Sequence, residues 1–446
     1  MQRLHPADFA CQETCFVLYM QPMKVLLFSL SMPELIMPTL PLGVVCVATA
    51  AQRDGHEVQI LEIALGSDAG QESAEAITAF APDAIGLSVR NIDDQTMRGT
   101  HFLLEPLKAI VASCRRISKA PIILGGAGYS MYPELLLEWL NADIGIKGDG
   151  EAALPAVLDH LRMGVDVAMI KGVYVKGRSP FKKICSILDL NKLSQPDPVL
   201  WPCPIEGRQG VWLPFQTRRG CPLACSYCST SSIEGTALRK RDPKSVAKHI
   251  SHHAEAGFKR FYCTDNTFNL PADYARALCQ AFIDAELAVS WTCIVYPYKI
   301  DEGLVSDMAL AGCIEVALGF ESGSPAILKN MRKRFSLDNV RQAAGLFKKY
   351  GIGLNGYLLL GGPGETRETV LESLSFADSL PLDFLKLTTG IRIYPDTELA
   401  RIATAEGVIA ADDDLLLPRF YLAEGLDGWL QDEITRWAAT RPHWQG

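Results

Sequence analysis

The sequence predicts a two-domain α/β protein: an N-terminal doubly wound, Rossmann-like sheet, a partial (βα)6 barrel, and a short, mostly helical C-terminal tail. Three observations lead to this prediction. With 446 residues, the chain is longer than one ordinary hydrophobic core accommodates. Short apolar runs alternate with segments of helical periodicity, which is typical of parallel sheets covered by helices. A proline-rich stretch divides this alternation into two series.

The first series covers residues 23–163 and predicts the doubly wound domain. Its strand-length apolar runs are Lys24–Ser29, Glu57–Ile63, Ala84–Val89, Pro121–Gly125 and Asp143–Lys147. Segments of helical period, such as Val44–Arg53 and Met131–Leu140, lie between them. Ligands of such sheets bind at the carboxyl ends of the strands. The turns there are therefore candidate binding loops, namely Pro41–Gly43, Ser88–Asp94, Gly125–Gly128 and Gly148–Glu151.

Two segments beside this domain are expected to lack a core of their own. Residues 1–22 are expected to be a disordered leader, with a translation start at Met20 or Met23 as the alternative. Residues 164–210 carry prolines at positions 180, 196, 198, 202 and 204, which prevent long helices. This second segment is predicted to be a linker that contains one short strand at Gly172–Lys176.

The second series covers residues 211–395 and predicts the barrel. Its strand candidates are Trp212–Thr217, Arg260–Thr264, Ser290–Val295, Glu315–Gly319, Gly353–Leu360 and Phe384–Thr389. Helical segments such as Pro243–Ala256, Ala272–Ala285 and Leu337–Tyr350 separate them, as in a βα barrel. Residues 396–446 are expected to form the helical tail.

Charge and composition narrow the classes of partner. The net charge of -8 provides no basic surface for nucleic acid, and a small-molecule or peptide substrate suits it better. No apolar run reaches the roughly 20 residues of a membrane-spanning helix. The first twenty residues, which contain Asp8 and Glu13, do not have the pattern of an export signal. The 13 cysteines are therefore expected to be reduced thiols or metal ligands in a cytoplasmic protein.

Three closely spaced cysteines follow the first strand of the predicted barrel. They are Cys221, Cys225 and Cys228, in a loop that begins Arg218-Arg219-Gly220. Three thiolates can bind three irons of a [4Fe–4S] cubane and leave the fourth iron open for chemistry. A structural zinc site normally needs four protein ligands, and this loop supplies no fourth cysteine or histidine. The spacing therefore favours a catalytic cluster.

The Cys-x3-Cys-x2-Cys spacing, with Tyr227 before the last cysteine, resembles the signature of the radical S-adenosylmethionine (radical SAM) superfamily. Glu321 and Ser322 resemble the family's strand-end residues that hold the ribose and methionine parts of SAM. Asp265 stands where relatives carry a second-strand motif near the SAM amino group. Two further segments resemble motifs of the family, Leu360–Thr366 and Ile391–Thr397. A Gly-Gly-Glu run is missing, which leaves the assignment of Asp265 less direct.

The resemblance implies the chemistry of that superfamily. SAM would chelate the open iron, accept an electron and yield methionine and a 5′-deoxyadenosyl radical, which abstracts hydrogen from an inert carbon. The protein would supply positioning and exclude water. A flavodoxin- or ferredoxin-type electron donor is the implied partner.

The first domain resembles the cobalamin-binding module of the cobalamin-dependent (class B methyltransferase-like) subgroup. The residues expected to contact cobalamin are Leu42, Gly43, Arg90, Asn91, Gly125, Gly126, Gly128, Gly148 and Glu151. An Asp-x-His-x-x-Gly loop, which would give cobalt a histidine ligand, is absent from the sequence. The loop Arg90–Gln95 is then expected beneath the corrin. The alternative is that this domain keeps the fold and binds nothing.

By resemblance, the expected activity is methylation of an unactivated carbon, with methylcobalamin as methyl donor and a second SAM to remethylate cobalt. A first alternative is a radical reaction of the same architecture without methyl transfer, such as cyclisation, ring contraction or oxidation. A second is tRNA methylthiolation, which requires three further cysteines in the leading domain, where Cys46 and Cys114 are too sparse. A third is a non-catalytic cobalamin or metal sensor.

Overall fold

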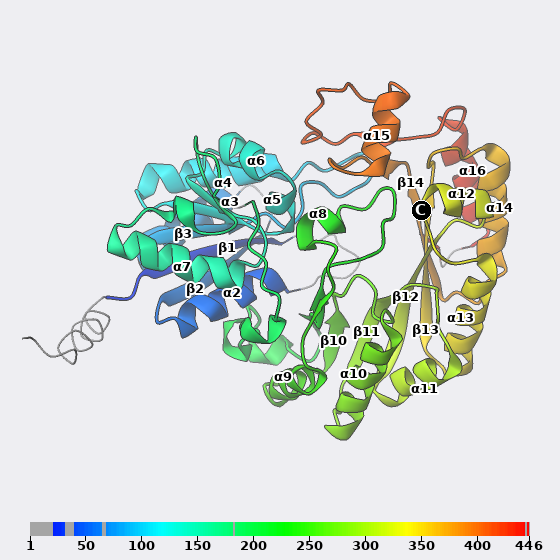
Figure 1. The fold of residues 1–446 in the computed structure, drawn as a ribbon, viewed down its shortest axis with the longest axis horizontal. Helices are drawn as coiled ribbons and strands as arrows, with labels where there is room; N and C mark the ends of the chain where they lie inside the picture. Colours follow the sequence, from blue (N-terminus) through cyan, green and yellow to red (C-terminus); the bar gives the residue numbers. More distant parts are fainter. Residues whose placement is uncertain (1–20, 32–39, 65–67, 182, 442–443, 446) are drawn as a thin grey trace, which may run out of the picture.

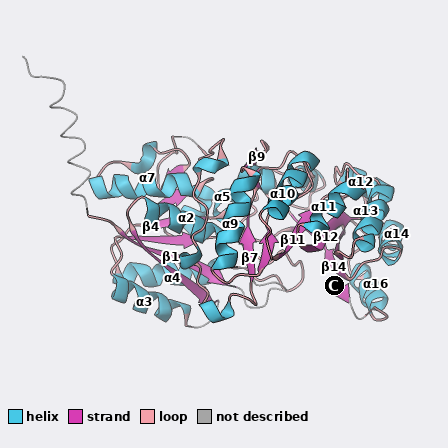
Figure 2. Cartoon of the chain, turned by 90° about the horizontal axis from the view of Figure 1, so that it is seen from below, coloured by secondary structure: helices cyan, strands magenta, loops and turns pink. Residues whose placement is uncertain are grey.

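The computed structural model describes residues 21–31, 40–64, 68–181, 183–441 and 444–445 (Figure 1). The leader expected for residues 1–22 lies outside the described residues, apart from Gln21 and Pro22. The chain forms two α/β parts, one built on a six-stranded sheet and the other on a seven-stranded sheet. In Figure 2 helices lie on both sides of the strands of the first part and along the outer side of the strands of the second part, and the expected α/β fold class is confirmed.

The first sheet has the strand order β2-β1-β3-β4-β5-β6. Its strands are β1 (Lys24–Ser31), β2 (Glu57–Ala64), β3 (Ala84–Ser88), β4 (Ile122–Gly125), β5 (Ile144–Ile146) and β6 (Val173–Val175). The first five are parallel, and β6 pairs antiparallel with β5. Part of the stretch expected to be a linker is therefore the edge strand of this sheet.

Helices cover both faces of this sheet, as a doubly wound fold requires. They are α2 (Leu42–Arg53), α3 (Ala69–Phe80), α4 (Leu104–Ile117), α5 (Ala127–Met131), α6 (Pro133–Trp139) and α7 (Gly150–Met163). Alternate residues of β1 face opposite sides. Val25 and Leu27 pack in one core with residues of α2 and α7, whereas Leu26 and Phe28 belong to the core formed with α3, α4 and α6.

The second sheet has the order β17-β14-β13-β12-β11-β10-β7, and all its pairings are parallel. Its strands are β7 (Trp212–Phe215), β10 (Arg260–Cys263), β11 (Ser290–Val295), β12 (Cys313–Glu321), β13 (Gly353–Leu360), β14 (Phe384–Thr389) and β17 (Trp444–Gln445). β7 and β17 are the two ends of the sheet and do not pair, so the barrel is open. This is the expected partial (βα)6 arrangement.

Helices follow the barrel strands and bury its outer face. They are α9 (Pro243–Glu255), α10 (Ala272–Asp284), α11 (Glu302–Leu310), α12 (Pro325–Asn330), α13 (Leu337–Lys349) and α14 (Arg367–Asp378). Side chains cap several N-termini: Asp242 and Asp301 cap α9 and α11, and Ser336 and Thr366 begin capping boxes on α13 and α14.

The remaining segments are short. Four 3₁₀ turns lie at Val167–Met169, Leu190–Lys192, Pro198–Leu200 and Ile205–Gly207. The tail contains α15 (Glu398–Ala405), α16 (Trp429–Ala438) and β16 (Phe420–Tyr421), which pairs antiparallel with β15 (Ile391–Arg392). Trp437 of α16 donates from its indole N–H to Asp378 of α14. None of the helices in the described ranges combines the length and apolar character that a membrane-spanning helix requires.

A buried ion pair joins the two parts. Arg392 Nε lies 2.8 Å from Asp93 Oδ2, and both side chains are almost fully buried. Arg392 also donates to the Leu415 carbonyl, which accepts from the Tyr132 hydroxyl. The loop after β3, the barrel end and the tail therefore meet at one point.

Candidate active site and cofactor cavity

The three motif cysteines lie on a loop that follows β7 at the carboxyl edge of the barrel sheet. The strands β8 (Arg218–Arg219) and β9 (Arg239–Lys240) pair at its base, and α8 (Thr230–Glu234) lies between them. Gly220 precedes the first cysteine with φ +89°, and a Cβ there would lie 2.1 Å from the Ala237 carbonyl oxygen. Only glycine fits this position, which fixes the direction in which the chain enters the loop.

Backbone hydrogen bonds hold the loop at separate points. The Cys221 N–H donates to the Gly235 carbonyl at 3.1 Å. The Ser226 N–H donates to the Met331 carbonyl at 3.1 Å, and the Ser226 carbonyl accepts from the Leu399 N–H at 2.8 Å. The loop is therefore held both by the barrel domain and by α15 (Glu398–Ala405) of the tail.

The spacing of the three sulfur atoms suits a cluster better than a single ion. In the described part of the chain, one group of three ligand residues brings its ligand atoms within 4.8 Å of one another, and it contains no cysteine. A tetrahedral zinc with Zn–S bonds of about 2.3 Å places its sulfurs roughly 3.8 Å apart. A cubane takes each thiolate on a different iron and spreads them further. The three sulfurs are thus too far apart to share a single tetrahedral ion, and this separation agrees with the cluster that the motif predicts.

Glu321 ends β12 at a β-bulge beside the cluster loop. The register against β13 shifts between Gly319 and Glu321, and Glu321 has φ +61°. A Cβ on Gly319 would lie 2.9 Å from Glu321 Oε1, so the glycine makes room for the carboxylate. Bulges commonly redirect a side chain next to an active site.

Lys333 connects Glu321 to the cluster loop, and the sequence analysis missed it. Its Nζ donates to Glu321 Oε1 at 3.1 Å and to the Tyr227 hydroxyl at 2.9 Å, with the side chain 5% exposed. Burial alone would lower the pKa of Lys333, but Glu321, Tyr227 and Cys225 raise it well above its usual value. A buried cation therefore lies beside Cys225. Its place in the basic run Arg332–Arg334 gives no sign of burial.

Two residues expected at the SAM site have protein partners. Asp265 is 1% exposed. Its Oδ1 accepts from the N–H groups of Thr217 and Arg218 at 2.8 and 3.2 Å, and its Oδ2 accepts from the Thr217 hydroxyl at 2.5 Å. Ser322 is buried, with its hydroxyl 2.9 Å from that of Ser373 in α14. Asp265 thus holds the junction between β7 and the cluster loop, and Ser322 holds the turn after β12.

A cavity opens at the carboxyl edge of the first sheet, where the sequence predicted binding loops. It encloses about 1050 Å³ of empty space, its open mouth included. The ends of β1, β3, β4 and β5 and the first turns of α2, α5 and α7 line it. Five residues expected to contact cobalamin are in this lining, namely Gly43, Gly125, Gly126, Gly148 and Glu151. The other four, Leu42, Gly128, Arg90 and Asn91, are outside it.

Glycines shape the cavity in two ways. A Cβ on Gly43 or Gly125 would have no neighbour within 4 Å, so a larger side chain there would enter the cavity. Gly126, at φ +104°, instead approaches the Val89 backbone, where a Cβ would lie 2.6 Å from the carbonyl oxygen. Gly128 packs against the same carbonyl and so allows α5 to approach the loop after β3 closely. Glycines at these positions let a large cofactor approach the backbone closely.

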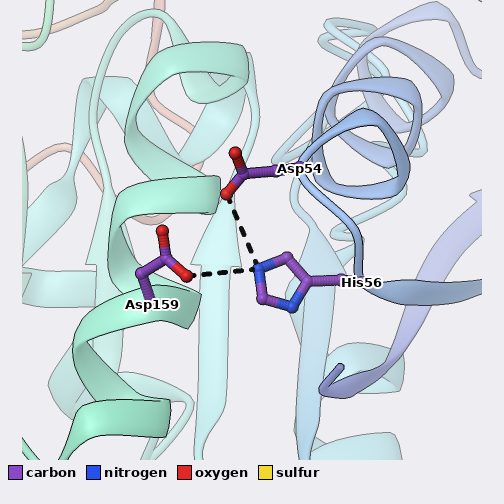
Figure 3. Close-up of side chains that lie close together, drawn as sticks. All are labelled: Asp54, His56 and Asp159. Carbon is purple, nitrogen blue, oxygen red and sulfur yellow. Dashed lines mark ion pairs between the residues drawn. The ribbon is translucent and has the colours of Figure 1, made fainter. Parts of the chain in front are cut away.

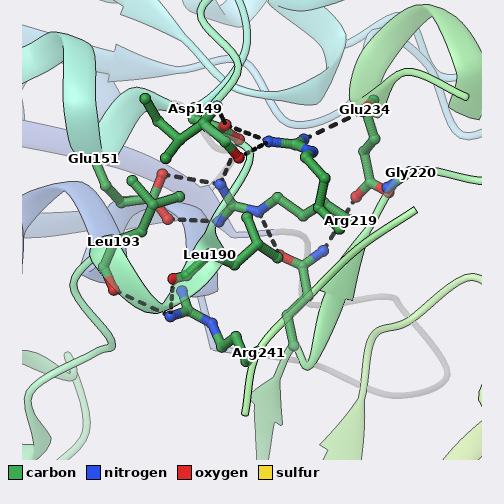
Figure 4. Close-up of polar contacts among 11 residues, drawn as sticks. Asp149, Glu151, Leu190, Leu193, Arg219, Gly220, Glu234 and Arg241 are labelled. Atoms are coloured by element: carbon green, nitrogen blue, oxygen red, sulfur yellow. Dashed lines mark hydrogen bonds and ion pairs between the residues drawn. The ribbon is translucent and has the colours of Figure 1, made fainter. Parts of the chain in front are cut away.

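A buried ionic network lies in the lining of this cavity (Figure 4). Arg219 Nη1 lies 2.7 Å from Asp149 Oδ1, and Arg219 Nη2 lies 2.5 Å from Glu151 Oε1. Arg239 Nη1 lies 2.5 Å from Asp149 Oδ2. Arg241 donates to the carbonyls of two residues of the expected linker, Leu190 and Leu193. All four residues of the ion pairs line the cavity.

The group of ligand atoms noted above is formed by Asp54, His56 and Asp159, on the side of the first domain (Figure 3). The Met23 N–H donates to His56 Nδ1 at 3.3 Å, so in the neutral ring the proton is on Nε2. That nitrogen lies 3.8 Å from Asp54 and 3.9 Å from Asp159. Metal-binding histidines donate, rather than accept, through their second nitrogen. This arrangement therefore fits a structural contact between α2 and α7.

Comparison with known proteins supports the division into two parts. The model of the Radical SAM superfamily matches residues 216–377, and that of the B12 binding domain matches residues 37–158. An uncharacterized methyltransferase of Pyrococcus horikoshii is 28% identical over 83% of this chain and 79% of its own length. A cytidylyl-2-hydroxyethylphosphonate methyltransferase of Streptomyces wedmorensis is 23% identical over 90% and 85%. An anaerobic magnesium-protoporphyrin IX monomethyl ester cyclase of Rubrivivax gelatinosus is 26% identical over 76% and 61%.

Solved structures share the whole two-part fold. The radical SAM methyltransferase TsrM from Kitasatospora setae, bound to tryptophan and a SAM analog, superposes with a TM-score of 0.81 at 22% identity. The match covers 95% of this chain and 90% of that one. The cobalamin-dependent SAM radical enzyme OxsB, with aqua-cobalamin and SAM bound, gives a TM-score of 0.73 at 16% identity, over 94% and 67%. At these identities the likeness shows the fold.

Proposed function

Since this chain belongs to the radical SAM superfamily and carries a B12-binding domain ahead of its radical SAM domain, we propose that it methylates an unactivated carbon of a small-molecule substrate. It is an enzyme with a [4Fe–4S] cluster, SAM and cobalamin as cofactors, related to cobalamin-dependent radical SAM methyltransferases. The substrate position and the route of methyl transfer are the parts that we propose.

The observation that carries the proposal is that residues of the cavity lining contact the cysteine loop. Arg219 and Glu234 line the cavity of the first domain, and Gly220, next to Cys221, donates to Glu234 Oε2 at 3.0 Å. A methyl donor in the cavity and a radical generator on the loop can then act on one substrate. Methylation through both cofactors requires that proximity.

When bound, the cluster, SAM and cobalamin supply the electron, the hydrogen-abstracting radical and the methyl group. We assign Cys221, Cys225 and Cys228 to the cluster. Glu321, which accepts a hydrogen bond from the buried Lys333 ammonium, is assigned to the polar part of SAM.

Among the remaining expected SAM contacts, we assign Tyr227 to the pocket wall, because its hydroxyl accepts from Lys333. Asp265 and Ser322 are assigned positioning roles, because their side chains hydrogen-bond to neighbouring protein groups. In the first domain, Gly43, Gly125, Gly126 and Gly148 are assigned to the corrin-facing wall.

The loop that begins at Arg90 and Asn91 is assigned to the lower corrin face, on the side of the barrel. Arg90 is close enough to Tyr262 of β10 for the two to influence each other's pKa. Leu42 and Gly128 support the adjoining helices α2 and α5. A flavodoxin- or ferredoxin-type donor remains the proposed source of electrons.

The test uses full-length protein purified anaerobically with hydroxocobalamin and reduced with titanium(III) citrate. Methyl-labelled SAM is supplied with a panel of small molecules that begins with tryptophan. We expect 5′-deoxyadenosine, S-adenosylhomocysteine and label in one product, and none of these with Cys225→Ala. A product without label would favour a radical reaction without methyl transfer, such as cyclisation. The similarity to a cyclase is the observation that favours this alternative. Absence of both nucleosides from cluster-loaded protein would contradict the proposal.

A further inference from the structure

We propose that Arg219 is a positioning residue that couples the cobalamin cavity to the cluster loop, so that filling either site stabilises the other. The proposal rests on the proposed function, because it takes cobalamin as the occupant of the cavity. Its evidence is a chain of contacts that begins at the cavity wall and ends at the first cluster cysteine.

On the cavity side, Arg219 forms ion pairs with two carboxylates at the N-terminus of α7. Its two terminal nitrogens contact both oxygens of Glu151, at 2.5 and 3.1 Å, and Nη1 also lies 2.7 Å from Asp149 Oδ1. The carboxylates are 3% exposed and the guanidinium is 15% exposed. Bidentate arginine–carboxylate pairs have a strict geometry, so the position of α7 determines that of Arg219.

The carboxylates are ionised in this arrangement. Burial alone would raise the pKa values of Asp149 and Glu151, but Arg219 and the hydrogen bonds around it hold both below their usual values. Arg239 balances the second negative charge through Asp149. Removing one member leaves a buried charge without its partner, which proteins tolerate poorly.

On the cluster side, Arg219 stands two residues before Cys221 in the chain. Its Nε donates to Gln216 Oε1 at 2.9 Å, and Gln216 Nε2 donates to Glu234 Oε1 at 3.1 Å. The other oxygen of Glu234 accepts from the Gly220 N–H at 3.0 Å. A shift of the arginine therefore reaches the first cysteine both along the backbone and through these side chains.

General docking of the two domains does not account for this arrangement. The Asp93–Arg392 ion pair already joins them, and neither residue lines the cavity. The Arg219 network, in contrast, is built from residues of the cavity wall. Cobalamin packed against that wall restricts the network, and a cluster bound to the loop restricts it from the other side.

Coupling of this kind is reciprocal, because binding free energies are linked. An iron(II) chelator takes iron from the opened loop, and the population of that opened state falls by the coupling factor when the cavity is filled. We therefore expect hydroxocobalamin to slow iron removal from the wild-type protein at least about fivefold, the lower end of typical site-to-site couplings. The measurement is the absorbance of the iron–chelator complex over time, with and without hydroxocobalamin, on anaerobically reconstituted protein.

Arg219→Gln should keep both cofactors bound and bring the ratio of the two rates close to one. Glu151→Gln removes the bidentate partner while keeping its size, and it should also bring the ratio close to one. This variant replaces Arg219→Gln in the experiment if Arg219→Gln folds poorly. Arg178→Gln is the matched control: it loses a bidentate pair with Asp166 that is about half exposed, and neither residue lines the cavity. Its ratio should equal that of the wild type.

A wild-type ratio of one, with cobalamin bound, would overturn the coupling and leave the proposed function in place. An Arg219→Gln protein with the wild-type ratio would likewise overturn it. If the wild type retains no hydroxocobalamin, the absorbance spectrum shows this before chelator is added, and the proposed function fails together with the coupling.

Discussion

Lys333 Nζ lies 3.1 Å from Glu321 Oε1, so a buried ammonium joins the end of β12 to the tyrosine that precedes Cys228. Along the chain, a turn and α12 separate the two residues. Neither charge has another fully charged partner of opposite sign within 4.0 Å among the described residues. This pair therefore controls whether Glu321 keeps its orientation beside the cluster loop.

Replacing this ammonium should destabilise the protein. Lys333→Met leaves the partly buried Glu321 carboxylate uncompensated, and we expect a loss of up to about 3 kcal/mol in the free energy of unfolding, the lower end for buried ion pairs. Adding Glu321→Gln should recover part of it, because the uncompensated charge is then gone. Urea unfolding of the two single variants and the double variant measures this. A loss in the double variant equal to the sum of the two single losses would show that the pair is not coupled.

The cluster cysteines should be separable from the other cysteines by iron content. Cys225→Ala removes one of three ligands, and we expect it to lose most of its iron and visible absorbance after anaerobic reconstitution. Cys203→Ala, in a half-buried position of the segment before the barrel, should keep the wild-type iron content. If both variants retained the same iron content, Cys225 would not be a ligand of the cluster.

A side chain placed on the cavity wall should exclude cobalamin without harming the fold. Gly125 has open space at its Cβ position, so Gly125→Val is expected to fold normally and to raise the dissociation constant for hydroxocobalamin at least about tenfold, the effect of losing about 1.4 kcal/mol. Gly345→Ala is the control, because its Cβ position is also open but lies in α13. It should bind like the wild type and gain about 0.5–1 kcal/mol in stability. Equal affinity in the valine variant would place the corrin elsewhere.

Glu365 should make stability depend on pH. Burial raises its pKa from 4.5 to about 7, and its Oε1 is buried without a hydrogen-bond partner. The folded protein therefore holds a proton that the unfolded chain releases, so stability should fall as pH rises from about 4.5 to about 7 and stay low above that. Glu365→Gln keeps an acceptor for the N–H groups of Gly361 and Gly362 and should remove this loss.

The difference between wild type and Glu365→Gln should reach about 3 kcal/mol at pH 8 and vanish near pH 4. Thermal unfolding at a series of pH values measures it. A difference that does not change with pH would mean that Glu365 is ionised in the folded protein.

The sequence by itself determined the features that depend on neighbouring residues. Every expected strand of both sheets is present, with ends shifted by a few residues, because the alternation of apolar runs and helical periods is a local property. The cysteine motif was equally visible, since its chemistry resides in eight consecutive residues, Cys221–Cys228. The glycines of the cavity could be found because each follows a predicted strand.

Only the tertiary structure decided which distant side chains meet. Arg219 and Glu151 are 68 positions apart and belong to different domains, so no local pattern indicates that they pair. Lys333 stands in a basic run that is typical of an exposed surface, but the fold buries it between Glu321 and Tyr227. Asp265 follows β10, as the sequence predicted. Its partners Thr217 and Arg218 follow β7, and they lie near Asp265 only because β7 and β10 pair in the sheet. Periodicity records which face of an element is buried, while charge pairing depends on how whole elements dock.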